Sequence, residues 1–530
     1  MAQQQNNISI TAPGFLGLNT QDSPLDMDQQ FASIAENCVI DKFGRISARK
    51  GIKYLTTNPA VLGGNPIIVM QEFLTADNAS RYLVCAGNNK LFVQQLVSPF
   101  ELVELTLPAL YTITADNWSM ATLNDKLYIV QAGHQPLLFE PTVDATAVRV
   151  WAEEPPTVGV DGYPNVVHAA FGRLWTASFD TNSAIVYWSG LLNGEQYTAG
   201  GSGSIATEEF WPQGYDRVNA ITGHNNFLVV FGQRNILLYQ TTSDVDNTIS
   251  LVDTIESIGC IAKDSVQSTG TDLLFVDSTG VRSLNRTIQE KSVPIGDISI
   301  NVRDEFQLLL QSVTDANDIK GVFNIDDGQY VVFLPPLNDT YVFDTRRLLP
   351  NGGAKVTLWR ELIVRCGQRF TTRVTRYGGL GGIYEYTGNV DIKLDVDNVT
   401  PVTDTVKLRY FLHPLDFGSP SNLLFPKQVD VTVISGNLGT LNLNWGFDFK
   451  DATTNRIEKS LTSVGSTFTW GGTAEWDSGI EWTSGTPIAQ LKYNVWGQGR
   501  NIQIGFDAEV AGDVLSIQEV NIQALSGRIL

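Results

Sequence analysis

The chain has 530 residues, with 36 Lys and Arg against 56 Asp and Glu, which gives a formal net charge of −20 at pH 7. This balance disfavours ordinary nucleic-acid binding, because there is no basic excess to neutralise phosphates. The length exceeds what one hydrophobic core supports, so we expect two to four domains.

Residues 1–60 are expected to form an extended arm and a hairpin ahead of the main domain. The stretch Ala12–Thr20 is broken by glycine and proline. Residues Gln29–Cys38 are predicted to form one short helix, because apolar side chains recur at helical spacing. A hairpin is predicted to turn at Lys42–Gly44, where glycine supplies a positive φ.

Residues 82–386 contain a degraded repeat of two short apolar strands joined by a polar or glycine turn. Its six copies begin at Tyr82, Leu127, Leu174, Phe227, Leu273 and Tyr330. A period near 40 to 50 residues with several short strands per unit is typical of β-propeller blades, which bury their faces by stacking around an axis. The repeat therefore predicts an all-β fold with a propeller of about six blades over residues 61–398. A run of hairpins from unrelated sandwiches is the alternative.

Two features of this propeller region are left with open alternatives. Either the 1–60 segment or Ile383–Tyr386 is expected to complete the last blade. One helix is predicted at about residues 300–314, within Asp297–Asp318, because apolar residues fall on one face and acidic residues come early. This helix would pack on the rim or at a subunit contact, or would cap one blade.

Residues 399–530 have a different sequence pattern, which predicts a β-sandwich-like domain. Long strands alternate apolar and polar residues, as in Val429–Ile434 and Leu441–Phe447. Such alternation indicates a sheet with one buried face. A Trp- and Gly-rich loop at Trp470–Trp482 lies between these strands and is expected to project or to pack against a neighbour.

The residue types that carry chemistry do not form a recognisable site, so we expect no enzyme activity, no metal and no cofactor. The histidines lack the spacing of metal ligands, and the four cysteines form no CxxC pair. Neither a GxSxG elbow nor a GxxxxGK[ST] loop occurs. These scattered residues are His134, His168, His224 and His413, with Cys38, Cys85, Cys260 and Cys366.

Carboxylates are plentiful, but their patterns favour structural roles. Asp326-Asp327-Gly328 is expected to be a hairpin turn, since strands lie on both sides. Asp391, Asp395 and Asp397 alternate with apolar residues and do not match the EF-hand pattern. A glycosidase would need two carboxylates about 5 to 10 Å apart, which the sequence does not test. No residue is therefore assigned as catalytic, cofactor-binding or metal-binding.

The two ends of the chain together resemble the tail nozzle proteins of short-tailed bacteriophages, also called tail tubular protein B or packaged-DNA stabilisation protein. The segments that carry the resemblance are Gly14–Thr20 with Ser23–Asp26, Ala35–Ile46 with Arg49–Gly51, Leu415–Gly418, Gly497–Phe506, and Ser516–Ala524 with Gly527-Arg528. These motifs are loose but occur in order over most of the chain.

The resemblance implies a structural virion protein located in the virion tail and made in the host cytoplasm. Six copies would form a ring beneath the portal and adaptor, with a propeller in each subunit and β-rich domains lining a channel. The ring would retain the packaged double-stranded DNA and conduct it during ejection without binding it specifically. Tail fibres or spikes are further expected partners, and the host cell surface is left open. No active-site residue is carried over.

Net charge gives a physical reason for such a channel. Six copies would carry a formal charge of −120, and an acidic lumen repels phosphate, so that DNA slides instead of adhering. The three elements outside the repeat are the candidate contacts with neighbours: the 1–60 arm, the Asp297–Asp318 helix and the Trp470–Trp482 loop.

Two alternatives remain open from the sequence. A glycan-binding or glycan-degrading propeller would stack sugars on tryptophans such as Trp118, Trp175, Trp188 and Trp211. The ordinary role of these residues is to fill blade cores. A receptor-binding tail protein is the second alternative, although the elongated repetitive shaft of such fibres is absent. The polar N-terminus lacks the features of a signal peptide, and no apolar run has the ~20 residues of a membrane helix.

Overall fold

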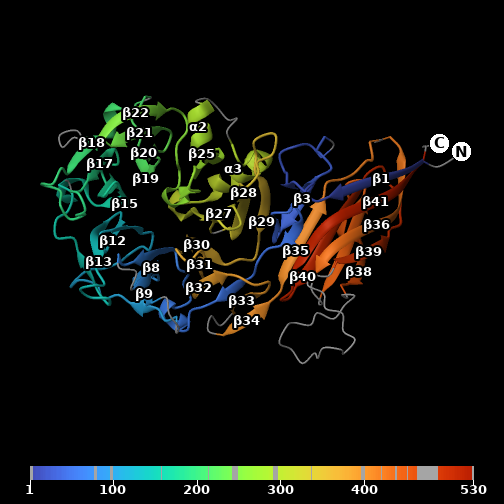
Figure 1. The fold of residues 1–530 in the computed structure, drawn as a ribbon, viewed down its shortest axis with the longest axis horizontal. Coiled ribbons are helices and arrows are strands. Elements are labelled where there is room, and N and C mark those ends of the chain that lie inside the picture. The colour runs from blue at the N-terminus through green and yellow to red at the C-terminus, as the bar shows by residue number, and fades with distance from the viewer. Residues whose placement is uncertain are drawn as a thin grey trace, which may run out of the picture.

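The computed structural model shows an all-β chain, as the sequence predicts, with a ring of small sheets at one end and a β-sandwich at the other (Figure 1). Both chain ends lie at the outer end of the sandwich. The structure describes residues 4–24, 26–76, 80–95, 100–156, 158–212, 214–241, 249–290, 297–335, 337–395, 400–418, 421–435, 439–450, 452–461 and 488–527.

Seven small sheets stand around a common axis and form a closed β-propeller. Strand β30 (Val364–Arg369) of the last blade lies against β7 (Val69–Leu74) of the first, which closes the ring. From the inner strand outward, the first blade contains β7, β8 (Arg81–Gly87), β9 (Lys90–Gln95) and β10 (Val103–Glu104), and the second contains β11 (Ser119–Leu123), β12 (Lys126–Gln131), β13 (His134–Phe139) and β14 (Val148–Val150). The third contains β15 (Pro164–Ala170), β16 (Arg173–Phe179), β17 (Ile185–Trp188) and β18 (Gly203–Ala206). The fourth contains β19 (Val218–His224), β20 (Phe227–Gly232), β21 (Ile236–Thr241) and β22 (Ile249–Ile255).

The last three blades depart from this regular pattern. The fifth has three strands, and the seventh takes one of its strands from the N-terminal segment. The fifth blade contains β23 (Gln267–Ser268), β24 (Leu273–Asp277) and β25 (Gly280–Ser283). The sixth contains β26 (Lys320–Asn324), β27 (Gln329–Leu334), β28 (Asp339–Asp344) and β29 (Lys355–Trp359). The seventh contains β30, β31 (Thr375–Gly379), β32 (Gly382–Tyr386) and β6 (Ile52–Tyr54), followed by β33 (Asp391–Leu394) and β34 (Pro401–Asp404).

The sequence repeat counts six blades, and the structure adds a seventh. The six predicted hairpins correspond to the first six blades. The extra blade is hard to see in the sequence because its inner strand, β30, contains two arginines and a glutamine, and because β6 comes from the other end of the chain. Of the two closing candidates, the N-terminal segment is the one that adds the closing strand, since β6 pairs antiparallel with β32.

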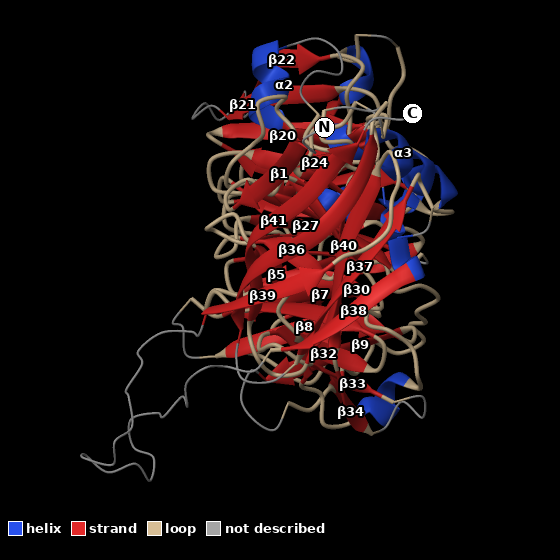
Figure 2. Cartoon of the chain, turned by 90° about the vertical axis from the view of Figure 1, so that its right-hand side faces the viewer, coloured by secondary structure: helices blue, strands red, loops and turns tan. Residues whose placement is uncertain are grey.

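Two sheets form the sandwich, and each mixes strands from both ends of the chain. Figure 2 shows the broad sheet that contains β1, β41, β36 and β39. The first sheet contains β1 (Gln4–Thr11), β4 (Cys38–Ile40), β5 (Ile46–Ala48), β36 (Leu423–Ser435), β39 (Ile488–Asn494) and β41 (Leu515–Gly527). The second contains β2 (Gly17–Leu18), β3 (Phe31–Glu36), β35 (Val406–Leu412), β37 (Thr440–Phe447), β38 (Asn455–Ser460) and β40 (Ile502–Val510).

The N-terminal segment is not the extended arm that the sequence suggests. Its strand β1 pairs with β41 along eight residues, and β3 pairs with β35. The predicted hairpin at Lys42–Gly44 is confirmed, because β4 and β5 pair on either side of it. These strands place residues 4–54 inside the sandwich and the seventh blade.

The short helix predicted over Gln29–Cys38 is also wrong, since β3 and β4 occupy that stretch. The register of β3 against β35 shifts between Ala32 and Ile34. A bulge of this kind adds one residue and changes the phase of the two-residue alternation. The buried residues Phe31, Ala32 and Ala35 therefore mimic the spacing of a helix.

The helices are few and short in the part of the chain that the structure describes. The predicted helix at about 300–314 is confirmed as α3, and its apolar residues Phe306 and Leu310 are buried. Phe306 packs edge-on against Tyr341 and Phe343 of β28, so the helix caps the sixth blade. The helical segments are α1 (Val158–Asp161), α2 (Leu284–Glu290), α3 (Arg303–Ser312), η1 (Pro59–Leu62), η2 (Thr207–Glu209), η3 (Lys263–Ser265), η4 (Ile300–Val302), η5 (Ala316–Asp318) and η6 (Ala452–Thr454).

One hydrophobic core joins the sandwich to the sixth blade. Strand β3 pairs in parallel with β29 at Glu36 and Leu358, so the blade and the second sheet of the sandwich are continuous. Buried side chains from both sandwich sheets, the sixth blade and α3 belong to a single apolar cluster. The two halves are thus held by core packing and not by a linker alone.

A buried ion pair fixes the N-terminal segment to the seventh blade. The Arg49 guanidinium donates to both carboxylate oxygens of Asp391, from Nη1 at 2.9 Å and from Nη2 at 2.7 Å. Their side chains are 2% and 6% exposed. The backbone N–H of Ile52 also donates to Asp391 Oδ1 at 3.1 Å. Because this residue begins β6, the carboxylate anchors the strand that completes the ring.

Replacing Asp391 with Asn is expected to destabilise this closure. Removing one partner of a buried pair leaves an uncompensated charge, at a cost of about 3 to 5 kcal/mol. Asp404→Asn in the same β33–β34 hairpin is the matched control, since Asp404 pairs with Lys393 at 2.7 Å while 35% exposed, and such pairs contribute roughly 0 to 1 kcal/mol. Thermal unfolding, with hydrogen exchange of the β6 amides, measures both. Equal effects of the two substitutions would contradict the anchoring role.

Candidate functional site: the axial channel of the propeller

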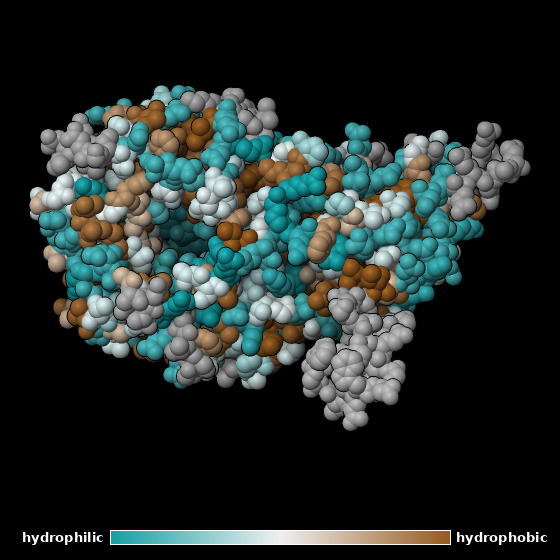
Figure 3. Space-filling view, in the orientation of Figure 1, coloured by the Kyte–Doolittle hydropathy of each residue, from teal (hydrophilic) through white to brown (hydrophobic). Residues whose placement is uncertain are grey.

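The inner strands of all seven blades enclose a narrow channel along the propeller axis. Figure 3 shows a hollow in the face of the ring, with mainly hydrophilic residues around it. The cavity has a volume of about 220 Å³. Its polar lining includes Gln71, Ser119, His168, Thr222, Gln267 and Gln368.

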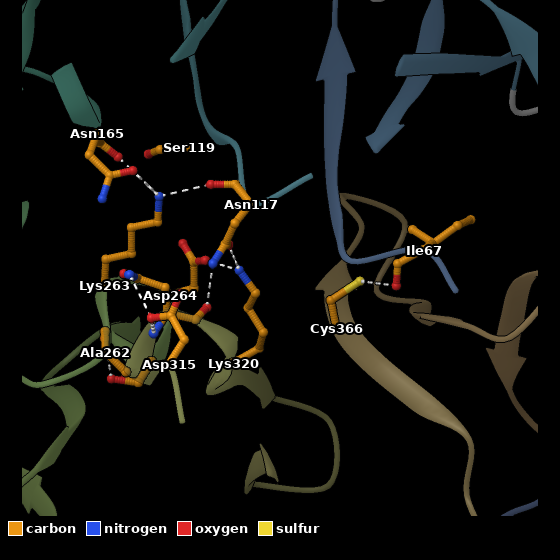
Figure 4. Close-up of polar contacts among 12 residues, drawn as sticks. Ile67, Asn117, Ser119, Asn165, Ala262, Lys263, Asp264, Asp315, Lys320 and Cys366 are labelled. Carbon is orange, nitrogen blue, oxygen red and sulfur yellow. Dashed lines mark hydrogen bonds and ion pairs between the residues drawn. The ribbon is translucent and has the colours of Figure 1, made fainter. Parts of the chain in front are cut away.

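A polar network crosses this channel at the end where the inner strands begin (Figure 4). Lys263, at the start of η3, is 8% exposed. Its Nζ donates to the backbone oxygen of Asn117 at 3.0 Å, to the backbone oxygen of Asn165 at 3.0 Å and to Asn165 Oδ1 at 2.9 Å. These three bonds use all the donors of an ammonium group, so Lys263 links the second, third and fifth blades.

A second lysine extends the network to the sixth blade. Lys320, the first residue of β26, donates to Asn117 Oδ1 and to Asp264 Oδ2. The Asn117 amide nitrogen in turn donates to the backbone oxygen of Asn317 at 2.9 Å. The network therefore ties four blades together across one mouth of the channel. We call Asn117, Asn165, Lys263, Asp264 and Lys320 the axial network.

Burial makes the charge on Lys263 costly. Loss of hydration lowers the pKa of this lysine from 10.5 to about 8; the nearby Asp264 opposes that shift, and the Lys320 ammonium adds to it. Neutral amide and carbonyl oxygens accept all three of its hydrogen bonds. The axial network thus holds a cation without a direct ion pair, which is the arrangement in which burial penalises charge most.

The histidine and the carboxylate of the described channel lining have structural partners. His168 accepts a hydrogen bond from the backbone N–H of Gly223 at 3.2 Å, and burial lowers its pKa to about 4. Among the described lining residues, Asp264 is the one carboxylate, and it bonds to Lys320. A glycosidase pair needs two carboxylates at one cleft, and this channel does not supply them.

The other sequence candidates have structural surroundings. His134 is buried and lies 3.1 Å from Gln131 and from the Thr114 hydroxyl. His413 is buried beside the backbone oxygen of Pro414, and His224 contacts Asn225. Burial raises the pKa of each cysteine thiol. Among the described residues, no group of three His, Cys, Asp or Glu side chains is placed to hold a metal.

The acidic candidates are tied up in turns and ion pairs. The predicted turn at Asp326–Gly328 is confirmed between β26 and β27, and Asp327 accepts from Lys50 at 2.7 Å. Asp391 holds Arg49, whereas Asp397 and the predicted loop at Trp470–Trp482 lie outside the described residues. The four tryptophans considered as sugar platforms are buried in blade cores: Trp118, Trp175, Trp188 and Trp211. A sugar-stacking role for them is therefore wrong.

Sequence reasoning missed the axial network because its members are far apart along the chain. Each one lies at or just before the first strand of a blade: Asn117 before β11, Asn165 within β15, Lys263 before β23, and Lys320 at the start of β26. An alignment of the blades by their inner strands would have placed these polar residues in register. The degraded repeat was recognised from its middle strands, which are the more apolar ones.

No family description matches this chain, and no curated protein matches it. Among solved structures, it is similar to the extracellular domain of a one component system protein from B. thetaiotaomicron, with 11% identity and a TM-score of 0.39, over 80% of this chain and 58% of that one. It is also similar to PorZ of Porphyromonas gingivalis, a surface component of the type-IX secretion system, with 12% identity and a TM-score of 0.35. This match covers 75% of this chain and 46% of PorZ.

A third similar structure is a protein from Lactobacillus plantarum, with 11% identity and a TM-score of 0.35, over 64% of this chain and 94% of that one. The chain thus spans about half the length of the first two structures. TM-scores this low support no conclusion about the activity of this chain. The strand pairing itself defines the class of protein, which is a seven-bladed β-propeller joined to a β-sandwich. No helix of the described residues is long and apolar enough to cross a membrane.

Lys263→Met tests the physical account of the axial network. Because the pKa of Lys263 is lower in the folded chain than the ordinary 10.5, the unfolded chain binds the extra proton between pH 8 and 10.5. The free energy of unfolding of the wild type should therefore rise relative to the variant over this window, by about 3 kcal/mol at most.

Unfolding midpoints of both proteins, measured from pH 7 to 10.5, check this expectation. Arg347→Met is the control, since Arg347 is exposed and should show no such pH-dependent difference. A wild-type advantage that shrinks as the pH rises would contradict the account.

Proposed function

We propose that this chain is a tail nozzle protein of a short-tailed bacteriophage. Six copies form a ring at the distal end of the virion tail, which retains the packaged genome and conducts DNA during ejection. The partners are the copies themselves, an upstream adaptor or portal-side protein, and tail fibres or spikes. The observation that supports this proposal most is the way the chain brings its two ends together.

The segments that carry the resemblance, although hundreds of residues apart, form one packed unit. Leu415 pairs with Ile502 in an isolated bridge, and β35 pairs with both β3 and β40. Strand β5 pairs with β41 at Ser516 and Ile517. Motifs that are loose one by one therefore belong to a single structural unit, as expected if they mark one domain.

Two glycines of these motifs have a clear structural need. Gly17 has φ +86°, and a Cβ there would lie 2.6 Å from the backbone oxygen of Val356. Gly44 has φ +76°, and a Cβ there would collide with Pro13. Only glycine takes such positions without strain. The resemblance thus rests on residues that this packing requires.

The negative charge is concentrated in one part of the propeller. Residues 101–345 contain 31 acidic and 11 basic residues, a net charge of −20, whereas residues 399–530 contain 13 acidic and 9 basic residues. Residues 101–345 span the second to sixth blades almost completely. If an acidic surface keeps DNA from adhering, these blades and not the sandwich are suited to face the DNA path.

The axial channel is unsuited to be that path. Its volume is only about 220 Å³. The hydrogen bonds of the axial network also join blades on opposite sides of the axis at one mouth. In the proposed ring, DNA therefore passes between the subunits and not through the individual propellers.

Electron cryomicroscopy of purified virions tests the proposal directly. A ring of six copies at the tail tip, with the second to sixth blades nearest the central lumen, is the expected result. Absence of the chain from the tail, or a ring with another number of copies, would overturn the nozzle assignment.

The isolated chain is expected to be largely monomeric at micromolar concentration and to form rings only on an upstream tail component. The N-terminal segment and α3 were candidate subunit contacts, but both pack within their own chain. Sedimentation of the purified protein, alone and with tail particles lacking it, measures this. Stable hexamers of the protein alone would show this expectation to be wrong.

The purified chain is expected not to retain duplex DNA on a filter at about 0.15 M salt, because it has no phosphate-neutralising excess of cations. The same assay at lower salt should also show no retention, since repulsion between like charges grows as screening falls. Retention at micromolar protein in either condition would contradict passage without binding.

A further inference from the structure

A second cavity lies beside the axial channel, at the mouth that the axial network crosses. Its volume is about 240 Å³, and its walls are Ile68, Thr314, Asp318, Lys320, Pro335 and Arg365. These residues come from the loop before β7, the α3–η5 region, β26, the turn after β27, and β30. Ile68 and Lys320 also line the channel. We call this cavity the side pocket.

Arg365 is a charged residue of the side pocket that lacks a full set of partners. Its Nη1 is buried and has no hydrogen-bond partner among the described residues. Burial lowers the pKa of this guanidinium, and Asp318 is the acidic group that opposes the shift. A buried donor of a charged group without an acceptor is costly. Because this nitrogen has almost no accessible surface, it is the remainder of the Arg365 side chain that lines the pocket.

Asp318 is the complementary group in the same pocket. Burial raises its pKa, Asp315 adds to that shift, and Lys320 and Arg365 oppose it. Arg365 and Asp318 thus feel each other's charge, yet neither takes part in an ion pair within 4.0 Å in the described part of the chain. Lys320, between them and the channel, is already bonded to Asp264 and Asn117. The pocket therefore presents one unpaired cation and one unpaired anion.

From this arrangement we propose that the side pocket binds a small zwitterion, an α-amino acid with an apolar side chain. Its carboxylate pairs with Arg365, because guanidinium groups match carboxylates in charge and geometry. Its ammonium group pairs with Asp318. Its side chain lies against Ile68 and Pro335, the apolar part of the wall. The volume suits a ligand smaller than a drug-sized molecule.

Charge balance favours this ligand over a simple anion or cation. Lys320, at the border of the side pocket, is compensated by Asp264, and the wall itself has one cation, Arg365, and one anion, Asp318, with Asp315 as a further anion nearby. A ligand with one charge would leave either Arg365 or Asp318 without a partner, whereas a zwitterion satisfies both. Both side chains are partly buried, and partial loss of hydration makes a charge without a partner costly. The carboxylate and the ammonium group of the ligand should therefore each bind better when the other is present.

Three probes separate these contributions in calorimetric titrations of the full chain. L-Leucine has both charges, isovalerate has the carboxylate alone, and isoamylamine has the ammonium alone. Leucine should bind at millimolar concentration or below, and each single-charge probe should bind weaker by about tenfold or more, the effect of losing one charge-assisted hydrogen bond.

Two variants should give opposite patterns with these probes. Arg365→Met should weaken leucine and isovalerate by about tenfold or more and leave isoamylamine unchanged. Asp318→Asn should weaken leucine and isoamylamine and leave isovalerate unchanged. Arg347→Met and Asp326→Asn remove exposed charges elsewhere and should leave leucine binding at the wild-type value. This crossed pattern cannot come from general misfolding.

A variant that fills the side pocket gives an independent check. Thr314 is exposed at the rim, so Thr314→Trp should abolish leucine binding while the unfolding midpoint stays within a few degrees of the wild type. Absence of leucine binding to the wild type at millimolar concentration would overturn the proposal. Equal binding of all three probes, or leucine binding unchanged by Arg365→Met and Asp318→Asn, would overturn it as well.

Discussion

Closure of the ring by the N-terminal segment is the constraint on which the whole architecture depends. A small sheet cannot bury both faces by itself, and a propeller solves this only when its first and last blades meet. Here the inner strands β30 and β7 meet, and the seventh blade is completed by β6, which arrives from the opposite end of the chain and is held by the Arg49–Asp391 pair. Earlier in the same segment, β3 joins the sandwich. One short stretch of chain therefore fixes both halves and their junction.

The local features of the fold were predictable because short-range patterns determine them. The six apolar hairpins, the helix α3 and the alternating strands β36 and β37 follow from spacing alone. The features that could not be predicted from the sequence depend on pairing between residues far apart in the chain. The seventh blade draws on residues more than three hundred positions apart, and the bulge in β3 gives buried residues a helical spacing. Neither feature has a local signal.

The axial network and the side pocket were unpredictable for a related reason. Lys263, Lys320 and Arg365 are single polar residues at the starts of different blades, and only the circular arrangement brings them together. Their chemistry is also unlike a catalytic motif. Lys263 is held by neutral oxygens, so it reinforces the ring, whereas Arg365 keeps a buried donor unpaired. A sequence pattern gives no information on which of these two cations has all its donors satisfied.

The closed channel and the uneven charge together limit how such a molecule could handle a polyanion. A propeller whose mouth is crossed by two lysines offers neither the width nor the charge that a sliding duplex requires. The second to sixth blades as a whole have the opposite charge balance, with 31 acidic and 11 basic residues over 101–345. A rigid wall that repels phosphate is therefore available only outside the individual propeller. If this chain forms a conduit for DNA, as proposed, the path therefore lies between several copies and not through one propeller.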